Sequence, residues 1–160
     1  YAMLEERGVL GGGMVKVDKY ELPDDLYYWG RNPDGSIRGR TWAKVEPDGR
    51  VRIGLTDRGQ DMAGKILFIR LRPKGSTVEQ GKPIGTIETA KWTGPIESPV
   101  SGTIDEVNEE LKRKPGLVNE DPYGKGWMVV IKPSKLEEDL KNLLKGDDAV
   151  KWLQDDLAGK

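Results

Sequence analysis

Residues 81–104 read GKPIGTIETAKWTGPIESPVSGTI, and this stretch decides the fold. Ahead of Lys91, side chains alternate with a period of two, which is typical of a half-buried strand. After it, the run from Pro99 to Gly102 supplies a turn, and residues 103–107 resume a strand. The spacing predicts that Lys91 lies at or near the tip of a β-hairpin and points toward solvent. A lysine held on a rigid turn is well placed to be recognised by a modifying enzyme.

The chain on either side of this hairpin is also mainly β. Pro-Asp-Gly runs within residues 32–36 and 46–50 are typical of hairpin connections. Thr56 is placed to cap a short helix that reaches Met62 and ends at Gly64. The expected strands are residues 41–45, 50–55, 65–71 and 127–131, with 65–71 buried on both faces or nearly so, and a helical turn capped by Asn108 runs to Lys112.

These elements predict a mainly β protein, a flattened sandwich of two antiparallel sheets with short helices and a C-terminal helical segment. A chain of 160 residues is long enough to bury ~70% of its unfolded surface. The side chains expected to contribute to the core are Trp42, Phe68, Ile69, Ile87, Ile104, Val129 and Ile131.

The last part of the chain, residues 134–160, is expected to be helical and to pack on the same domain. Ser134 and Glu137 have the spacing of a capping box, in which both side chains satisfy free backbone N–H groups. Two apolar stripes at helical spacing follow, one in a helix after the capping box and one in a helix from about Asp147. Their members are Leu136, Leu140, Leu143 and Leu144, then Val150, Leu153 and Leu157.

The first 13 residues differ from the rest of the chain. They end in Gly11-Gly12-Gly13 just before Met14, and they lack the basic start and long apolar core of a signal peptide. We expect residues 1–13 to be a remnant of expression, with Met14 as the native start. Residues 14–133 then form the β domain.

Composition excludes several classes of function. The net charge is −1 with 33% charged residues, so no overall basic field favours nucleic acid or anionic lipid. No apolar run approaches the ~20 residues needed to span a bilayer, and a cytoplasmic location is expected. The chain has neither Cys nor His, which excludes thiol nucleophiles, imidazole acid–base chemistry and His/Cys metal sites. Any redox chemistry must therefore come from a cofactor.

The hairpin resembles the swinging-arm hairpin of the lipoyl and biotinyl carriers, whose fold is the hammerhead type of flattened sandwich. Biotin acceptor lysines usually lie between two methionines, whereas Lys91 lies between Ala90 and Trp92. The H proteins of the glycine cleavage system place Glu three residues before the lysine, which matches Glu88. They also place a Pro-Val-Ser-Gly turn after it, which matches residues 99–102.

Two further runs are similar to H proteins, and the resemblance spans roughly Tyr28 to the C-terminus. The runs are VRIGLTD at residues 51–57 and VNEDPYGKGW at residues 118–127. The resemblance implies a non-catalytic carrier whose partners are glycine decarboxylase, aminomethyltransferase and dihydrolipoyl dehydrogenase. A lipoate ligase or an octanoyltransferase would attach the lipoate.

The same resemblance assigns roles to residues of the hairpin. Lys91 is the expected site of lipoyl attachment, and Glu88 is expected to help the ligase recognise it, although it could be an ordinary surface charge. Gly102 is expected to be a positive-φ residue that shapes the hairpin turn. Trp92 is expected either to contact the arm or a partner, or simply to cover an apolar patch.

Three departures from the H-protein pattern concern the cargo. Arg40 lies where the family usually has His, and a permanent cation there is expected to repel a protonated aminomethyl arm. Residues 32–36 form an insertion. Trp92, Thr93 and Gly94 replace the usual small residues after the lysine.

These departures leave two alternatives to a glycine cleavage carrier. One is an H-like lipoate-binding protein that serves a heterodisulfide-reductase-like complex in sulfur oxidation. The other, from a different class, is an unmodified small β-sandwich used as a binding module. The mass of the intact protein would separate this last alternative from the other two.

Overall fold

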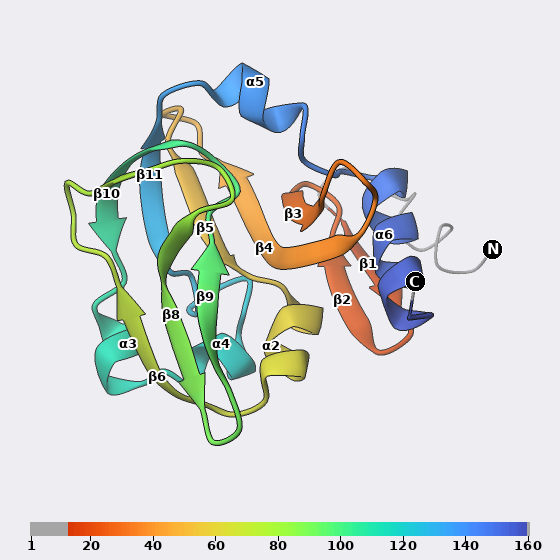
Figure 1. Cartoon of the computed structure of the whole chain (residues 1–160), viewed down its shortest axis with the longest axis horizontal. Coiled ribbons are helices and arrows are strands. Elements are labelled where there is room, and N and C mark those ends of the chain that lie inside the picture. The colour runs from red at the N-terminus through yellow and green to blue at the C-terminus, as the bar shows by residue number, and fades with distance from the viewer. Residues whose placement is uncertain (1–12, 160) are drawn as a thin grey trace.

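The computed structural model describes residues 13–159 (Figure 1). The expectation for residues 1–13 lies outside this range except for Gly13, whose carbonyl oxygen accepts a hydrogen bond from Asp24 N at 2.8 Å. The strands are β1 Met14–Val17, β2 Tyr20–Pro23, β3 Tyr27–Arg31, β4 Ile37–Val45, β5 Val51–Leu55, β6 Ile66–Leu71, β7 Thr77–Val78, β8 Pro83–Thr89, β9 Thr93–Glu97, β10 Gly102–Val107 and β11 Val129–Pro133. The helices are α2 Asp57–Ala63, α3 Glu110–Arg113, α4 Leu117–Glu120, α5 Leu136–Leu140 and α6 Asp147–Leu157.

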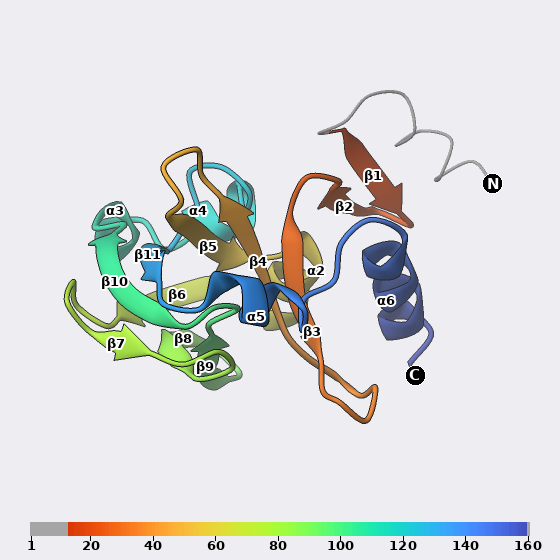
Figure 2. The ribbon, with the colours of Figure 1, turned by 90° about the horizontal axis from the view of Figure 1, so that it is seen from above.

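Two antiparallel sheets form the body of the molecule, which confirms the predicted fold class. One sheet has the strand order β3-β4-β5-β11-β10-β7, and the other has the order β6-β8-β9. A separate hairpin, β1-β2, lies beside α6 at one side of the molecule (Figure 2). Within residues 13–159, no helix is long and apolar enough to cross a membrane.

Both predicted Pro-Asp-Gly turns connect neighbouring strands. Asn32 N donates to Ser36 O at 2.8 Å between β3 and β4, and Glu46 N donates to Arg50 O at 2.8 Å between β4 and β5. The predicted helix after β5 is also confirmed, because Thr56 Oγ1 accepts from Gly59 N at 3.0 Å at the start of α2. This helix lies beside the β8-β9 hairpin (Figure 1).

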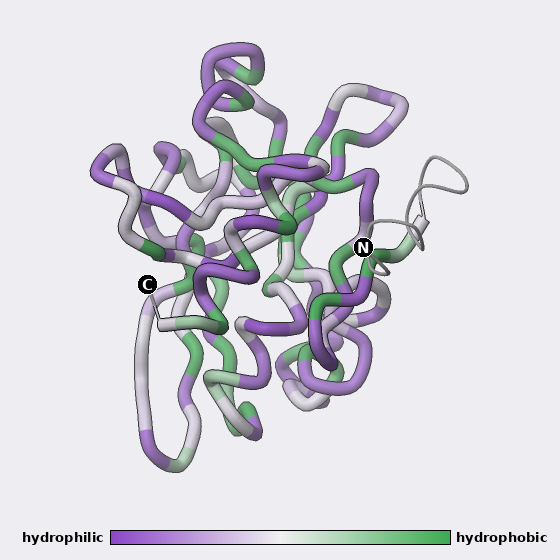
Figure 3. The backbone as a smooth tube through the Cα atoms, turned by 90° about the vertical axis from the view of Figure 1, so that its right-hand side faces the viewer, coloured by the Kyte–Doolittle hydropathy of each residue, from purple (hydrophilic) through white to green (hydrophobic). Residues whose placement is uncertain are grey.

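The main core lies between the two sheets. Figure 3 shows hydrophobic residues along stretches of chain that run through the body, whereas many outer loops are hydrophilic. Of the predicted core residues, all but Phe68 are buried, with relative exposures of 8% or less. The buried residues of the main core are Ala43, Val51, Ile53, Leu55, Ile66, Ile69, Val78, Ile84, Ile87, Ile96, Val100, Ile104, Leu111, Val118, Met128, Val129 and Ile131.

The prediction for Phe68 was wrong, as was the prediction that residues 65–71 are buried on both faces. Phe68 is 60% exposed because it pairs with Glu88 and shares its outward direction. The register shifts between Ile66 and Phe68, so Leu67 is an extra residue in the strand. This bulge keeps Ile66 and Ile69 turned into the core while Leu67 and Phe68 both face solvent.

A second cluster, the terminal core, joins the two ends of the described chain. Trp152 is 1% exposed and donates from Nε1 to Gly30 O at 3.0 Å, so α6 is fixed against β3. Trp152 was not among the residues predicted to lie in the core. The buried members of the terminal core are Val15, Val17, Tyr20, Leu22, Leu26, Tyr28, Trp42, Ala149, Val150, Trp152 and Leu153.

The C-terminal segment departs from the predicted capping box. Helix α5 has Lys135 at its N-cap with no side-chain capping bond, and Ser134 N instead donates to Ser101 O at 3.0 Å. The helix ends at Leu140, so the leucine stripe does not lie on one helix; Leu144 forms a bridge with Tyr28. The helix predicted from about Asp147 is confirmed as α6.

Asn108 lies close to the start of α3, near the helical turn that it was predicted to cap. Its Oδ1 accepts a hydrogen bond from Glu110 N at 3.3 Å, at the first residue of α3. Its amide nitrogen also donates to Trp127 O at 2.7 Å, which fixes the chain just before β11. Asn108 therefore connects α3 to the last strand of the large sheet.

Candidate functional site

Lys91 lies at the tip of the β8-β9 hairpin, as predicted. Thr89 N donates to Trp92 O at 2.8 Å, so Ala90 and Lys91 form the two-residue connection. Thr89 Oγ1 also accepts from Lys91 N at 3.4 Å. The Lys91 side chain is exposed, and it forms no ion pair with any of residues 13–159.

Glu88 lies on the outer face of the hairpin, one residue before the last pair of the ladder. It pairs with Phe68 on β6 and with Thr93 on β9, so the three side chains form one row across the sheet. All three residues are exposed. Like Lys91, Glu88 makes no ion pair or side-chain hydrogen bond within the described chain.

Gly102 lies at the start of β10, after the turn and not within it. Its φ is +156°, and a Cβ atom at this position would lie 2.1 Å from Lys132 O on the neighbouring strand β11. The glycine is thus required by the close approach of two backbones. Asp139 Oδ2 holds the preceding turn by accepting from Ser101 N at 2.6 Å.

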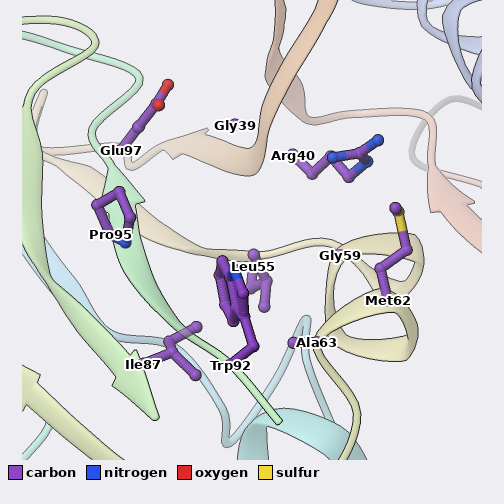
Figure 4. Close-up of a pocket in the computed structure, with 10 residues that line it drawn as sticks. All are labelled: Gly39, Arg40, Leu55, Gly59, Met62, Ala63, Ile87, Trp92, Pro95 and Glu97. Atoms are coloured by element: carbon purple, nitrogen blue, oxygen red, sulfur yellow. The ribbon is translucent and has the colours of Figure 1, made fainter. Parts of the chain in front are cut away.

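Trp92, the residue after Lys91, lies along one wall of a cleft (Figure 4). The indole covers the backbone of Gly94, where a Cβ atom would lie 2.1 Å from Trp92 Cζ2. Trp92 remains 48% exposed, so its other face is open to the cleft. The cleft has a volume of about 490 Å³ and is lined by Gly39, Arg40, Leu55, Gly59, Met62, Ala63, Ile87, Trp92, Pro95 and Glu97.

Arg40 lines this cleft, but its cation is not free. Its guanidinium makes two hydrogen bonds of 2.8 Å to Asp156 on α6, donated by Nε and Nη2. Arg58 Nε also approaches Asp156 at 3.4 Å. Burial disfavours the charged form of Asp156, but Arg40 and Arg58 outweigh it and hold the pKa of this carboxyl below its ordinary value.

This ion pair bears on the prediction that Arg40 repels a protonated arm, which stays a prediction. The Asp156 carboxylate, shared with Arg58, offsets part of the positive charge beside the cleft. The Asp156 side chain is only 6% exposed, so the pair is held largely away from water. No sequence signal links these residues, which are 116 positions apart.

The acidic residue of the cleft is balanced in the same way. Glu97 Oε1 accepts hydrogen bonds of 2.8 Å from Trp29 Nε1 and from Arg38 Nε. Met62 and Trp92, which are 52% and 48% exposed, therefore supply much of the open surface of the cleft, whereas Leu55 and Ile87 are buried. Within residues 13–159, no group of His, Cys, Asp or Glu is arranged to hold a metal ion.

The site therefore has the features of a carrier protein. An exposed lysine stands on a rigid hairpin, an apolar cleft lies beside it, and every ionised side chain lining that cleft is already paired. Comparison with known proteins assigns the family within this class. The model of the family described as "Glycine cleavage H-protein" matches residues 34–156, and the chain belongs to this family.

Individual relatives agree with this assignment. "Glycine cleavage system H protein 2" of Aquifex aeolicus is 45% identical over 143 residues, which cover 88% of this chain and 84% of that protein. "Probable glycine cleavage system H protein 2" of Saccharolobus solfataricus is 42% identical over 149 residues, covering 92% and 95%. The crystal structure of a glycine cleavage system H protein from Mycobacterium marinum matches with a TM-score of 0.61 and 31% identity, covering 71% of this chain and 87% of that one.

Members of this family are lipoyl carriers that catalyse no reaction themselves, and so is this chain. Its β1-β2 hairpin precedes the part matched by the family model, which begins at residue 34. The part of the chain that forms the lysine hairpin and the cleft lies inside the match.

Proposed function

We propose that Lys91 carries the lipoyl group, joined to its Nζ by an amide bond. The observation that carries this proposal is the position of Lys91 in the two-residue connection of the β8-β9 hairpin. The tip holds the backbone in place through the Thr89–Trp92 hydrogen bond, whereas the lysine side chain stays free. Glu88, three residues earlier and exposed, is the proposed recognition residue for the attaching enzyme.

The cleft beside the hairpin supports a resting place for the arm. Its walls from Leu55, Ile87 and Trp92 are apolar, which suits the hydrocarbon chain of a lipoyl group. Arg40 and Glu97 line it as well, and both are held in ion pairs with neighbouring side chains. When bound, the lipoyl group supplies the dithiol chemistry that a chain without Cys lacks.

The proposed cargo is the aminomethyl group of glycine cleavage. The partners are then glycine decarboxylase, aminomethyltransferase and dihydrolipoyl dehydrogenase, all of which act on the arm. The Asp156 carboxylate weakens the main objection to this cargo, because it offsets part of the positive charge of Arg40 and Arg58. The cytoplasmic location expected from the sequence stays a prediction.

The sulfur-oxidation alternative has less support than before. Of the three departures that raised it, the cation at Arg40 is paired with Asp156. The relatives named above are all called glycine cleavage H proteins, so their names give it no support either. We therefore retain the aminomethyl carrier as the proposal.

Peptide mapping after acylation tests the attachment site. Supplied with lipoate and ATP, a lipoate ligase should modify Lys91 alone, and Lys91→Arg should abolish the added mass completely. Lys65→Arg is the matched control, because Lys65 is exposed and precedes Ile66, which pairs with Thr89 near the same tip. A lipoyl mass on another lysine, or acceptance that survives Lys91→Arg, would contradict the proposal.

A second measurement tests the cargo. Lipoylated protein can be loaded by a glycine decarboxylase, and the release of ammonia and formaldehyde can then be followed. We expect slow release from the unaltered protein and faster release from Asp156→Asn, which leaves Arg40 without its carboxylate partner. Failure to load at all would contradict the aminomethyl cargo.

A further inference from the structure

The outer face of the β6-β8-β9 sheet carries an exposed aromatic ring that nothing in the described chain covers. Phe68 is 60% exposed, the highest value among the large hydrophobic residues of the described chain. Its neighbour Leu67, the bulged residue, is 38% exposed. An exposed apolar pair of this kind costs solvation free energy unless a partner covers it.

The register places this ring close to the modified lysine. Phe68 pairs with Glu88, and Glu88 pairs with Thr93. We call these three residues the outer row. Only the Thr89–Trp92 pair separates the outer row from the connection that contains Lys91.

We propose that the outer row is the docking face for the enzyme that acylates Lys91, with the Phe68 ring as its apolar anchor. This inference rests on the proposed attachment at Lys91 and adds to it the surface that the enzyme reads. The partner is an acyltransferase or ligase that presents an activated acyl group, either an acyl adenylate or an acyl thioester. It would offer an apolar pocket for the ring and a donor for the Glu88 carboxylate.

The chemistry of attachment favours this partner over the enzymes that use the finished arm. The attaching enzyme forms an amide between the acyl carbonyl carbon and Lys91 Nζ. The bond from that carbon to the adenylate oxygen or carrier sulfur breaks, and the amine gives up a proton. This enzyme must bring Nζ itself into its active site, whereas a later enzyme meets the far end of a long arm. Only the attaching enzyme is therefore obliged to cover the hairpin tip.

An enzyme that covers the hairpin tip with an interface of ordinary size would also contact the outer row. A stable interface covers about 800 Å² on each partner, which is far more than a two-residue tip provides. On the inner side, the hairpin faces the cleft and α2, which contributes Met62 and Ala63 to the lining. The outer side is open, and its exposed ring is the kind of group that anchors an interface, while the Glu88 carboxylate can accept a hydrogen bond from a partner.

Acylation kinetics of the full chain test the proposal. With a lipoate ligase, lipoate and ATP, Phe68→Ser should lower kcat/KM for modification about tenfold, chiefly through KM, whereas Phe68→Tyr should keep most of it. Val45→Ser is the matched control, because Val45 is also apolar and 37% exposed but lies at the end of β4, in the other sheet. It should be acylated at the unaltered rate. Equal urea midpoints would show that both variants are folded.

Each other outcome overturns the inference. Acylation of Phe68→Ser at the unaltered rate would contradict the docking face, and an equal loss in Val45→Ser would show a non-specific effect of surface hydrophobicity. If Phe68→Ser is acylated normally but is poorly loaded by glycine decarboxylase, the row serves an enzyme that uses the arm. A different result would contradict the proposed attachment itself: the unaltered protein would gain no mass on Lys91.

Discussion

On one face of the β6-β8-β9 sheet, Ile69 and Ile87 pair with each other and are buried in the main core. On the opposite face, one residue along each strand, Phe68 pairs with Glu88 in solvent. The two pairs are consecutive on the same two strands, so they lie close together along the sheet. What differs is the direction of the side chains. Stability therefore depends on the inner face, and the outer face is free to serve recognition.

The largest expected difference between the two faces is in stability. Ile87→Ala removes a buried side chain and should lower the free energy of unfolding by ~2–5 kcal/mol. Phe68→Ala should change it by no more than ~0.5 kcal/mol, because the ring is already in water. Urea unfolding measures both values. A comparable loss in the two variants would show that the outer face also contributes to the core.

The Arg40–Asp156 pair beside the inner face should give a smaller effect. Asp156→Asn removes the negative charge and one of the two oxygen atoms that accept from Arg40, and should cost ~1–3 kcal/mol. The folded-state pKa of Asp156 lies below its ordinary value, so its contribution is complete above the unfolded pKa of about 3.9. That contribution is lost as the pH falls through the lower, folded pKa.

Unfolding of both proteins as a function of pH checks this sign. The difference in stability between the unaltered protein and Asp156→Asn should be constant near neutral pH and should shrink only in acid. Glu88→Gln is a suitable control, because Glu88 is exposed and makes no ion pair or side-chain hydrogen bond within the described chain. A difference that grows toward low pH would contradict the assigned role of Asp156.

The smallest effect concerns the indole that covers Gly94. Gly94→Ala places a methyl group where Trp92 Cζ2 would lie 2.1 Å away, so the ring must move toward solvent at a cost of ~1 kcal/mol. The fluorescence of Trp92, taken as the difference from a Trp92→Phe background, should shift to longer wavelength. Thr93→Ala, on the outer face, should leave this emission unchanged. An unshifted spectrum in Gly94→Ala would show that the indole does not depend on the bare backbone at Gly94.

Local patterns in the sequence were sufficient for the hairpin but not for the direction of every strand. The alternation before Lys91 and the turn after it predicted the tip, and Pro-Asp-Gly runs predicted two more connections. The run from Ile66 to Leu71 contains five apolar residues around Arg70, so it shows no clear alternation. The bulge at Leu67 depends on pairing with β8, which local patterning does not show.

The cleft was also hard to predict, because residues distant in sequence form it and local patterns do not show their contacts. Trp92 and Arg40 differ from the residues that H proteins usually have at these positions. The side chains around them, however, belong to other parts of the chain. Asp156 lies on the last helix and Glu97 on β9, and each is held by residues distant in sequence. The capping box failed because Ser134 N is used in a hydrogen bond to Ser101, and α5 starts two residues later.

The location of Asp156 on α6 connects the cleft to motions of the chain ends. Helix α6 packs in the terminal core with β1 and β2, a small unit at one side of the molecule (Figure 2). Peripheral units of this kind can open locally while the rest of a protein stays folded. Each opening would withdraw Asp156 and leave Arg40 as an unpaired cation at the cleft. Amide hydrogen exchange in α6 would therefore also report how often the electrostatic potential beside Lys91 changes.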